Sequence, residues 1–141
     1  MRSVFVHLKE ATEDNAALWL SSFTYAQGLK APWLYPDSKN ATLYINFYRD
    51  YQEFEPEDYE RLIATLGCAP SLSIIADVSG RVDGTTEVKY FVTAALRQFN
   101  GVGEDEYSTH FWTLEEIEDN ILVEGLHFFD FKGAYKLHSE E

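Results

Sequence analysis

The sequence predicts one α/β or α+β domain over residues 1–141, in which about four helices pack on a mainly parallel or mixed sheet of about five strands. Two observations predict this class. Segments with the two-residue period of strands alternate along the chain with segments that have the helical period of about 3.6 residues. Hydrophobic residues make up 45% of the 141-residue chain, which suits one domain with one core.

The chain begins with a predicted strand over residues 4–8, where apolar side chains alternate with polar or mixed positions. Thr12 caps the helix that follows, and Gly28 ends it. The buried face of this helix has apolar residues at i, i+3, i+4 and i+7, which are Ala16, Trp19, Leu20 and Phe23. Residues 29–39 contain two prolines and are predicted to form a loop.

Two further strands are predicted, one on each side of a second helix. Residues 42–48 alternate between two faces, one apolar and one carrying Tyr44 and Tyr48. Pro56 suits the first turn of the helix, and Gly67 suits its end. Residues 72–78 are apolar on both faces, as expected of a central strand that is covered on two sides.

The clearest helical stripe lies over residues 85–99. Its apolar residues are Val88, Phe91, Val92, Ala95, Leu96 and Phe99. A strand over residues 107–112 is expected next, reached from strand 72–78 by a right-handed crossover. The core residues expected from these patterns are Leu62, Ile74, Phe91, Val92 and Leu96.

The end of the chain holds one more predicted helix and one more predicted strand. Thr113 and Glu116 have the spacing of a capping box, which starts a short helix. A last strand is predicted over residues 126–131, followed by a polar tail over residues 132–141.

Charge and composition exclude several kinds of partner. The net charge of −13 disfavours nucleic acid and anionic membranes, since both attract clustered Lys and Arg. No segment approaches the roughly 20 apolar residues of a membrane helix, and the apolar N-terminal run is too short for a signal peptide. The expected location is therefore the cytoplasm. Cys68 is the only cysteine, so it has no internal disulfide partner, and we expect it to be a small buried residue.

A turn from Asp77 to Thr86 is the first candidate site. It connects a central strand to a helix, where ligands often bind in α/β proteins. Its candidate ligand residues are Asp77, Ser79, Arg81 and Asp83. The glycine spacing matches neither common phosphate-binding motif, and the alternative is a tight turn in which Asp83 or Thr85 caps the helix.

The four histidines are the second candidate. His7, His110, His127 and His138 lack the spacing of metal ligands, so no metal, cofactor or hydrolytic triad is expected. His110 has acidic neighbours and could act as a general base. The alternative is a hydrogen-bonded histidine on a sheet face.

Acidic residues give the third candidate. No Lys or Arg occurs between Arg97 and Lys132, and carboxylates that lack basic neighbours can steer a basic partner. The candidate partner-binding residues are Glu104, Asp105, Glu106, Glu115, Glu116, Glu118 and Asp119. A second acidic cluster over residues 50–60 is interleaved with aromatic residues. The alternatives are a solvated acidic surface, or a hydrophobic contact through Tyr44, Tyr48 or Trp33.

Several stretches in the middle third of the chain carry a family resemblance. They are Asp77-Val78-Ser79-Gly80-Arg81, Glu87-Val88, Phe91-Val92, Phe99, Gly101-Val102, Asp105-Glu106-Tyr107-Ser108, His110 and Trp112-Thr113-Leu114-Glu115-Glu116-Ile117. The pattern resembles small acidic bacterial proteins that act as immunity partners of polymorphic toxins. The resemblance implies a cytoplasmic protein that binds and blocks a toxin, and it assigns no functional residue.

Three functions follow as hypotheses. The leading one is a non-enzymatic binding protein, an immunity protein in particular, whose acidic surface occludes a basic toxin or another basic protein. The alternative is a small enzyme or anion binder that uses the turn from Asp77 to Thr86 and His110. A further alternative is a module that forms homodimers through aromatic surface. Co-purification distinguishes the first, because an immunity protein should retain a partner.

Overall fold

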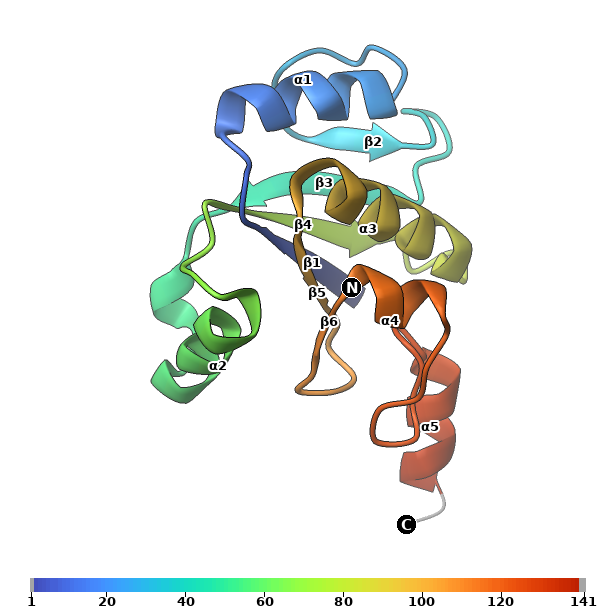
Figure 1. Ribbon diagram of the computed structural model, residues 1–141. Helices are drawn as coiled ribbons and strands as arrows, with labels where there is room; N and C mark the ends of the chain where they lie inside the picture. The colour runs from blue at the N-terminus through green and yellow to red at the C-terminus, as the bar shows by residue number, and fades with distance from the viewer. Residues whose placement is uncertain (1, 140–141) are drawn as a thin grey trace.

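The computed structural model describes residues 2–139, and the side chains of residues 2–137. Within this range six strands form one open sheet in the order β2-β3-β4-β1-β5-β6 (Figure 1). The strands are β1 Arg2–Leu8, β2 Trp33–Tyr35, β3 Leu43–Tyr48, β4 Leu72–Val78, β5 Gly101–Glu104 and β6 Phe111–Trp112. The helices are α1 Glu13–Phe23, α2 Pro56–Leu66, α3 Thr85–Phe99, α4 Leu114–Glu118 and α5 Phe131–Ser139, with a 3₁₀ turn η1 at Tyr51–Glu53. The architecture is α+β.

The prediction of a mainly parallel or mixed sheet of about five strands is wrong, because every neighbouring pair of strands is antiparallel. Residues 33–35, within the predicted loop, form β2 and pair with β3. The N-terminal strand β1 inserts between β4 and β5 and runs opposite to both. The connection through α3 therefore joins β4 to β5, which are parallel to each other but are not neighbours, because β1 lies between them.

Two further predictions fail in the last third of the chain. The segment 107–112 is mostly loop, and only Phe111–Trp112 pairs as β6. The segment 126–131 contributes one isolated bridge, between Val123 and Leu126, and its apolar residues are buried in irregular structure. Part of the predicted polar tail lies in α5, where the Asp130 side chain accepts a hydrogen bond from the N–H of Gly133.

Several local signals in the sequence gave correct element ends, but Gly28 did not, because α1 ends at Phe23 with Thr24 as its C-cap. Thr12 and Thr113 each accept a hydrogen bond from the N–H three residues on, as N-caps do. Gly67 ends α2 with φ 89°, a left-handed conformation that favours glycine. Cys68 follows it and is exposed, so the expectation that it is buried was wrong.

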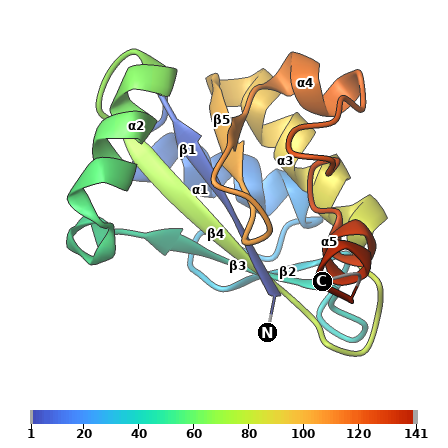
Figure 2. The same cartoon turned by 90° about the horizontal axis from the view of Figure 1, so that it is seen from below.

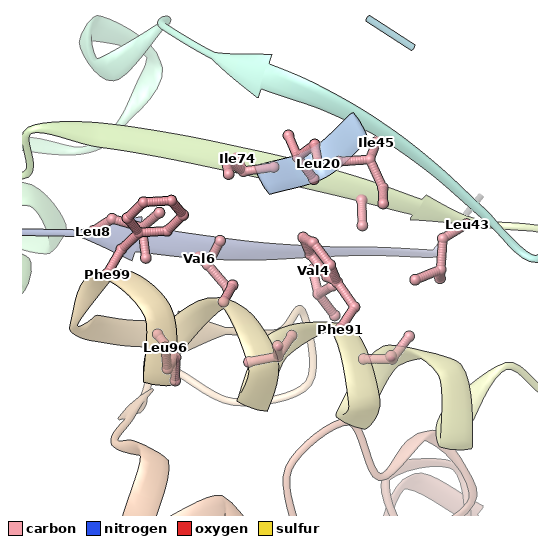
Figure 3. Packing of buried hydrophobic residues seen from close by; sticks show 14 of the residues in the cluster. Val4, Val6, Leu8, Leu20, Leu43, Ile45, Ile74, Phe91, Leu96 and Phe99 are labelled. Atoms are coloured by element: carbon pink, nitrogen blue, oxygen red, sulfur yellow. The ribbon is translucent and has the colours of Figure 1, made fainter. Parts of the chain in front are cut away.

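One face of the sheet is covered by α1 and α3. Figure 3 shows Phe91 and Phe99 of α3 pointing toward Val4 and Leu8 of β1. The predicted core residues Ile74, Phe91, Val92 and Leu96 belong to this cluster, and each is at most 2% exposed. Strand β4 lies between β3 and β1, which confirms that it is interior to the sheet. Residues 2–139 contain no helix that is both long and apolar enough to cross a membrane.

The opposite face of the sheet is covered only in part. Helix α2 packs against one end of it, where Leu62 and Leu66 join Val102 and Phe111 in a second, smaller core. Seen from below in Figure 2, α2 lies over that end, and the central strands β4 and β1 continue beyond it without a helix on them. The candidate site lies on this uncovered part of the sheet.

Candidate functional site

The strand register defines the uncovered surface as cross-strand rows. Partners across β3, β4, β1 and β5 place Asn46, Ile75, Phe5 and Glu104 in one row. The next row toward the open end runs from β2 to β1 through Leu34, Tyr44, Asp77 and Ser3. Side chains of both rows point away from α1 and α3 because successive residues of a strand alternate between faces. We call these eight residues the open face.

The open face combines an apolar centre with carboxylates. Every one of its residues is half-buried, which leaves the rings of Phe5 and Tyr44 and the side chains of Leu34 and Ile75 in part accessible. Asp77 accepts a hydrogen bond of 2.6 Å from Ser3 Oγ, which fixes its carboxylate on this surface. None of the eight residues is Lys or Arg. Apolar contact area beside fixed carboxylates suits a basic protein surface.

Aromatic residues border the open face where α2 begins. The ring of Tyr48 lies edge-on to Phe5, with centroids 5.0 Å apart, and it also contacts Tyr51 and Phe54. Tyr51 and Phe54 come from the second acidic cluster, over residues 50–60, that the sequence singled out. Burial, and then the negative charge of Glu53, raises the pKa of Tyr48. The open face thus continues into an aromatic and acidic border.

A buried hydrogen-bond chain lies beneath that border. His7 is 0% exposed, its Nδ1 lies 2.7 Å from Ser73 Oγ, and its Nε2 lies 2.7 Å from Glu104 Oε1. Tyr51 donates its hydroxyl to Ser73 Oγ at 2.7 Å. One arrangement of protons satisfies all four groups, with Tyr51 donating to Ser73, Ser73 to Nδ1, and Nε2 to Glu104. Glu104 of the open face is therefore held by a chain that reaches into the core.

This chain was missed at the sequence level, where no hydrolytic triad was expected. Serine, histidine and glutamate in this order resemble the relay of serine hydrolases. Ser73, however, is 0% exposed, and its oxygen already contacts both Tyr51 and His7. Because no substrate carbonyl can reach Ser73 Oγ in this arrangement, the geometry supports a structural role. Its members come from separate strands and η1, so no local motif could have revealed it.

The predicted partner-binding residues separate into groups with different surroundings. Glu104 lies on the open face and Glu106 is exposed in the following loop, but Asp105 is only 4% exposed. Glu115, Glu118 and Asp119 are exposed on and just after α4, which packs on the α3 side of the sheet. Two acidic side chains of α4 have local partners: Glu118 pairs with Arg97, and Glu116 completes the capping box and binds His110.

Asp105 has a structural role. Its carboxylate accepts hydrogen bonds from the main-chain N–H groups of Tyr107, Ser108 and Phe129. Burial raises the pKa of Asp105, while these three hydrogen bonds act in the opposite direction. A carboxylate enclosed in this way is not available to a partner.

The predicted ligand turn lies beside a cavity at the start of α3. This cavity has a volume of about 620 Å³ and is lined by the first residues of α3 and by residues 127–132. Of the four candidate ligand residues only Asp83 lines it, whereas Asp77 lies on the open face, Ser79 is buried and Arg81 is exposed.

Asp83 occupies the N-terminus of α3, where an anion would otherwise bind. It accepts hydrogen bonds from the N–H and the hydroxyl of Thr85 and pairs with Lys132. The two bonds from Thr85, and then Lys132, lower the pKa of Asp83 to about 2. The N-cap of α3 is Gly84, which has no side-chain cap bond, so the expectation that Asp83 or Thr85 caps this helix was wrong; Asp83 binds Thr85 from the position before the cap. An anionic ligand would compete with this carboxylate, which belongs to the chain.

His110 lies apart from the other candidate groups. Its Nε2 is 3.0 Å from Glu116 Oε1, and its ring packs edge-on against Trp112. In the described part of the chain, no group of three or more His, Cys, Asp or Glu side chains is arranged to hold a metal ion. His138 has no described side chain.

Comparisons with protein-family models, with curated proteins and with solved structures gave no match to this chain. The geometry and the charge of the open face are therefore the features that indicate a function.

Proposed function

We propose that this chain is a non-enzymatic protein-binding protein that covers a basic protein partner with its open face. The observation that carries the proposal is the uncovered half of the sheet, in which apolar side chains lie between the fixed carboxylates of Asp77 and Glu104. A face of this kind has the apolar centre and polar margin of protein interfaces. Tyr44 provides the hydrophobic contact, and Trp33 does not, because it is fully buried.

Charge supports a basic partner. The chain carries a net charge of −13, so its electrostatic field attracts a cationic protein over a distance of roughly one Debye length, about 8 Å at physiological salt. The His7 chain holds the carboxylate of Glu104 in place before a partner arrives, and a fixed group loses less entropy on binding than a mobile one.

The proposal includes an immunity role in the cytoplasm, as the sequence resemblance implies. The partner would be a basic toxin whose anion-binding site is occupied by carboxylates of the open face. Such a complex inhibits by occlusion and requires no chemical step.

Affinity capture on the immobilised chain, followed by kinetics with the purified captured protein, tests the proposal. We expect a basic protein that associates more slowly as salt increases and whose own activity is blocked by one equivalent of this chain. Tyr44→Ala with Asp77→Asn should weaken binding at least about tenfold, since truncated hot-spot residues have effects of this size. Asparagine at position 77 keeps an oxygen that can accept the Ser3 bond.

The matched control is Glu115→Gln on α4, which removes one charge, as Asp77→Asn does, and lies on the other side of the sheet. It should leave binding unchanged. If Glu115→Gln lost binding while the open-face variant bound fully, the interface would lie on α4 and not on the open face. Simultaneous reversal of Glu104, Asp105 and Glu106 is not a useful test, because it would bury a lysine at Asp105.

A second candidate function is ligand binding in the cavity beside α3, and it is favoured by the volume of about 620 Å³ and by Lys89 in its wall. Titration with inorganic phosphate tests it. A rise in melting temperature that disappears in Lys89→Ala would support this function, and an unchanged melting temperature would count against it.

A further inference from the structure

Three aromatic rings from different elements meet on the side of the sheet that α1 and α3 cover, opposite the open face. Phe23 of α1 lies 4.7 Å from Tyr35 of β2 and 5.7 Å from Tyr90 of α3, between ring centroids. Tyr35 and Tyr90 are 6.1 Å apart, and the three rings are within 25° of parallel. We call these two tyrosines, with Tyr25 two residues after Phe23 and within electrostatic reach of Tyr35, the tyrosine surface.

Much of this surface is accessible. Tyr25 is 77% exposed and Tyr90 is 58% exposed, while Tyr35 is half-buried between its neighbours. Single exposed apolar residues are ordinary, but rings gathered from three elements form a platform on which a flat group can stack.

The backbone that presents Tyr25 is held in a conformation that side chains disfavour. Tyr25 and Ala26 have φ values of 60° and 65°, in the left-handed region. The N–H of Ala26 donates to Ser21 O at 2.6 Å, and the amide of Gln27 bonds both the N–H and the carbonyl of Leu34. Such conformations persist where surrounding contacts impose them, and they concentrate at functional sites.

The tyrosine surface also has one carboxylate beside it. Burial is the main cause that raises the pKa of Tyr35, and the Glu87 carboxylate raises it too, so Glu87 lies within electrostatic reach of the Tyr35 ring. The faces of aromatic rings attract cations. A carboxylate beside several ring faces therefore selects a positively charged and flat group.

We propose that the tyrosine surface binds arginine side chains of a protein partner, with the guanidinium stacked on the rings and paired with Glu87. Arginine fits better than lysine because its charged group is planar and weakly hydrated. The net charge of −13 makes an arginine-bearing partner the complementary one. This site lies on the other side of the sheet from the open face, so it stands or fails separately from the function proposed above.

Titration by nuclear magnetic resonance, with tyrosine ring signals assigned by Tyr→Phe variants, tests this site. The probes are a peptide that alternates arginine with glycine and the same peptide with lysine for arginine. We expect the signals of Tyr25, Tyr35 and Tyr90 to shift with the arginine peptide, which should bind several-fold more tightly. Tyr25→Ala with Tyr90→Ala should weaken binding roughly fivefold to thirtyfold, and Glu87→Gln should weaken it too.

Tyr135 on α5 gives the matched control, because it is 77% exposed, as Tyr25 is. Tyr135→Ala should leave binding unchanged. Equal affinity for the lysine peptide, or equal shifts at Tyr135, would show unspecific attraction to an acidic chain and overturn the proposal. A dimer in solution that dissociates in the Tyr25→Ala, Tyr90→Ala variant would also overturn it, because the occupant would then be a second copy of the chain.

Discussion

The main-chain N–H of Phe129 donates a hydrogen bond of 2.7 Å to Oδ2 of Asp105. Phe129 itself has φ 54°, an unfavourable conformation for a bulky residue, and its ring is 0% exposed. Oδ1 of Asp105 accepts from Tyr107 and Ser108. One buried carboxylate thus joins the loop after β5 to the segment that leads into α5.

Asp105→Asn should lower the free energy of unfolding by about 1–3 kcal/mol. An amide has only one accepting oxygen, so either the Phe129 bond or the pair from Tyr107 and Ser108 is lost, and buried N–H groups remain without an acceptor. Urea unfolding measures the change. Glu106, the exposed neighbour of Asp105, gives the control. The free energy of unfolding of Glu106→Gln should stay within about 0.5 kcal/mol of that of the native chain. Equal stability of the two variants would contradict this role.

The pH dependence of stability should carry the signature of Asp105. Its pKa is raised in the folded protein, chiefly by burial, so the folded state binds a proton more tightly than the unfolded state does. This contribution therefore makes the protein more stable as pH falls toward the ordinary aspartate pKa, and the gain is lost as pH rises through the folded pKa. The difference in unfolding free energy between the native chain and Asp105→Asn should therefore widen as pH falls from neutral toward the ordinary aspartate pKa. If this difference in unfolding free energy narrows as pH falls, Asp105 is not the group responsible for the pH dependence.

The chain from Tyr51 to Glu104 should behave as one unit. Ser73→Ala leaves His7 and Tyr51 without their shared partner and should lower the free energy of unfolding by about 1–3 kcal/mol. Tyr51→Phe removes only a donor and should lower it by about 0.5–1.5 kcal/mol. In the double variant the two losses should not add, because both remove the same hydrogen bond. Tyr59, whose ring contacts those of Tyr51 and Phe54, gives the control: Tyr59→Phe removes a tyrosine hydroxyl outside the chain. Additive losses would show that the contacts are independent.

Gly101→Ala should disrupt the pairing of β5 with β1. A Cβ atom at this position would lie 2.1 Å from the carbonyl oxygen of His7, and backbone cannot move aside as a flexible side chain can. We expect a loss of several kcal/mol, above the roughly 1–3 kcal/mol of ordinary overpacking. Gly80→Ala is the control, since no heavy atom lies within 4 Å of its added Cβ. Thermal unfolding followed by circular dichroism compares the two.

Local features of the sequence predicted local structure well, because a cap or a helical stripe depends on residues a few positions apart. Thr113 with Glu116 and the stripe through Phe91 are of this kind. The antiparallel order of the strands could not be predicted from such local features. It depends on where β1 inserts and on β2, whose three residues between two prolines are too few to show a period.

The candidate site was predicted less well, because burial decides the role of an acidic residue and sequence does not reveal burial. Asp105 and Glu106 are neighbours in an acidic run, yet one is enclosed by main-chain donors and the other is exposed. The open face was only partly foreseen, through Tyr44, Asp77 and Glu104. Its members come from β1 to β5 and meet only through the register of the strands.

The bonds between Gln27 and Leu34 also determine how this sheet can be extended. Strand β2 is an outer strand, and Leu34 would otherwise offer its N–H and carbonyl to another strand. Because a side-chain amide of the same chain already occupies both groups, an incoming peptide cannot continue the hydrogen-bond ladder there. The chain is thereby protected from edge-to-edge aggregation at β2, and recognition at this end of the sheet must use side chains.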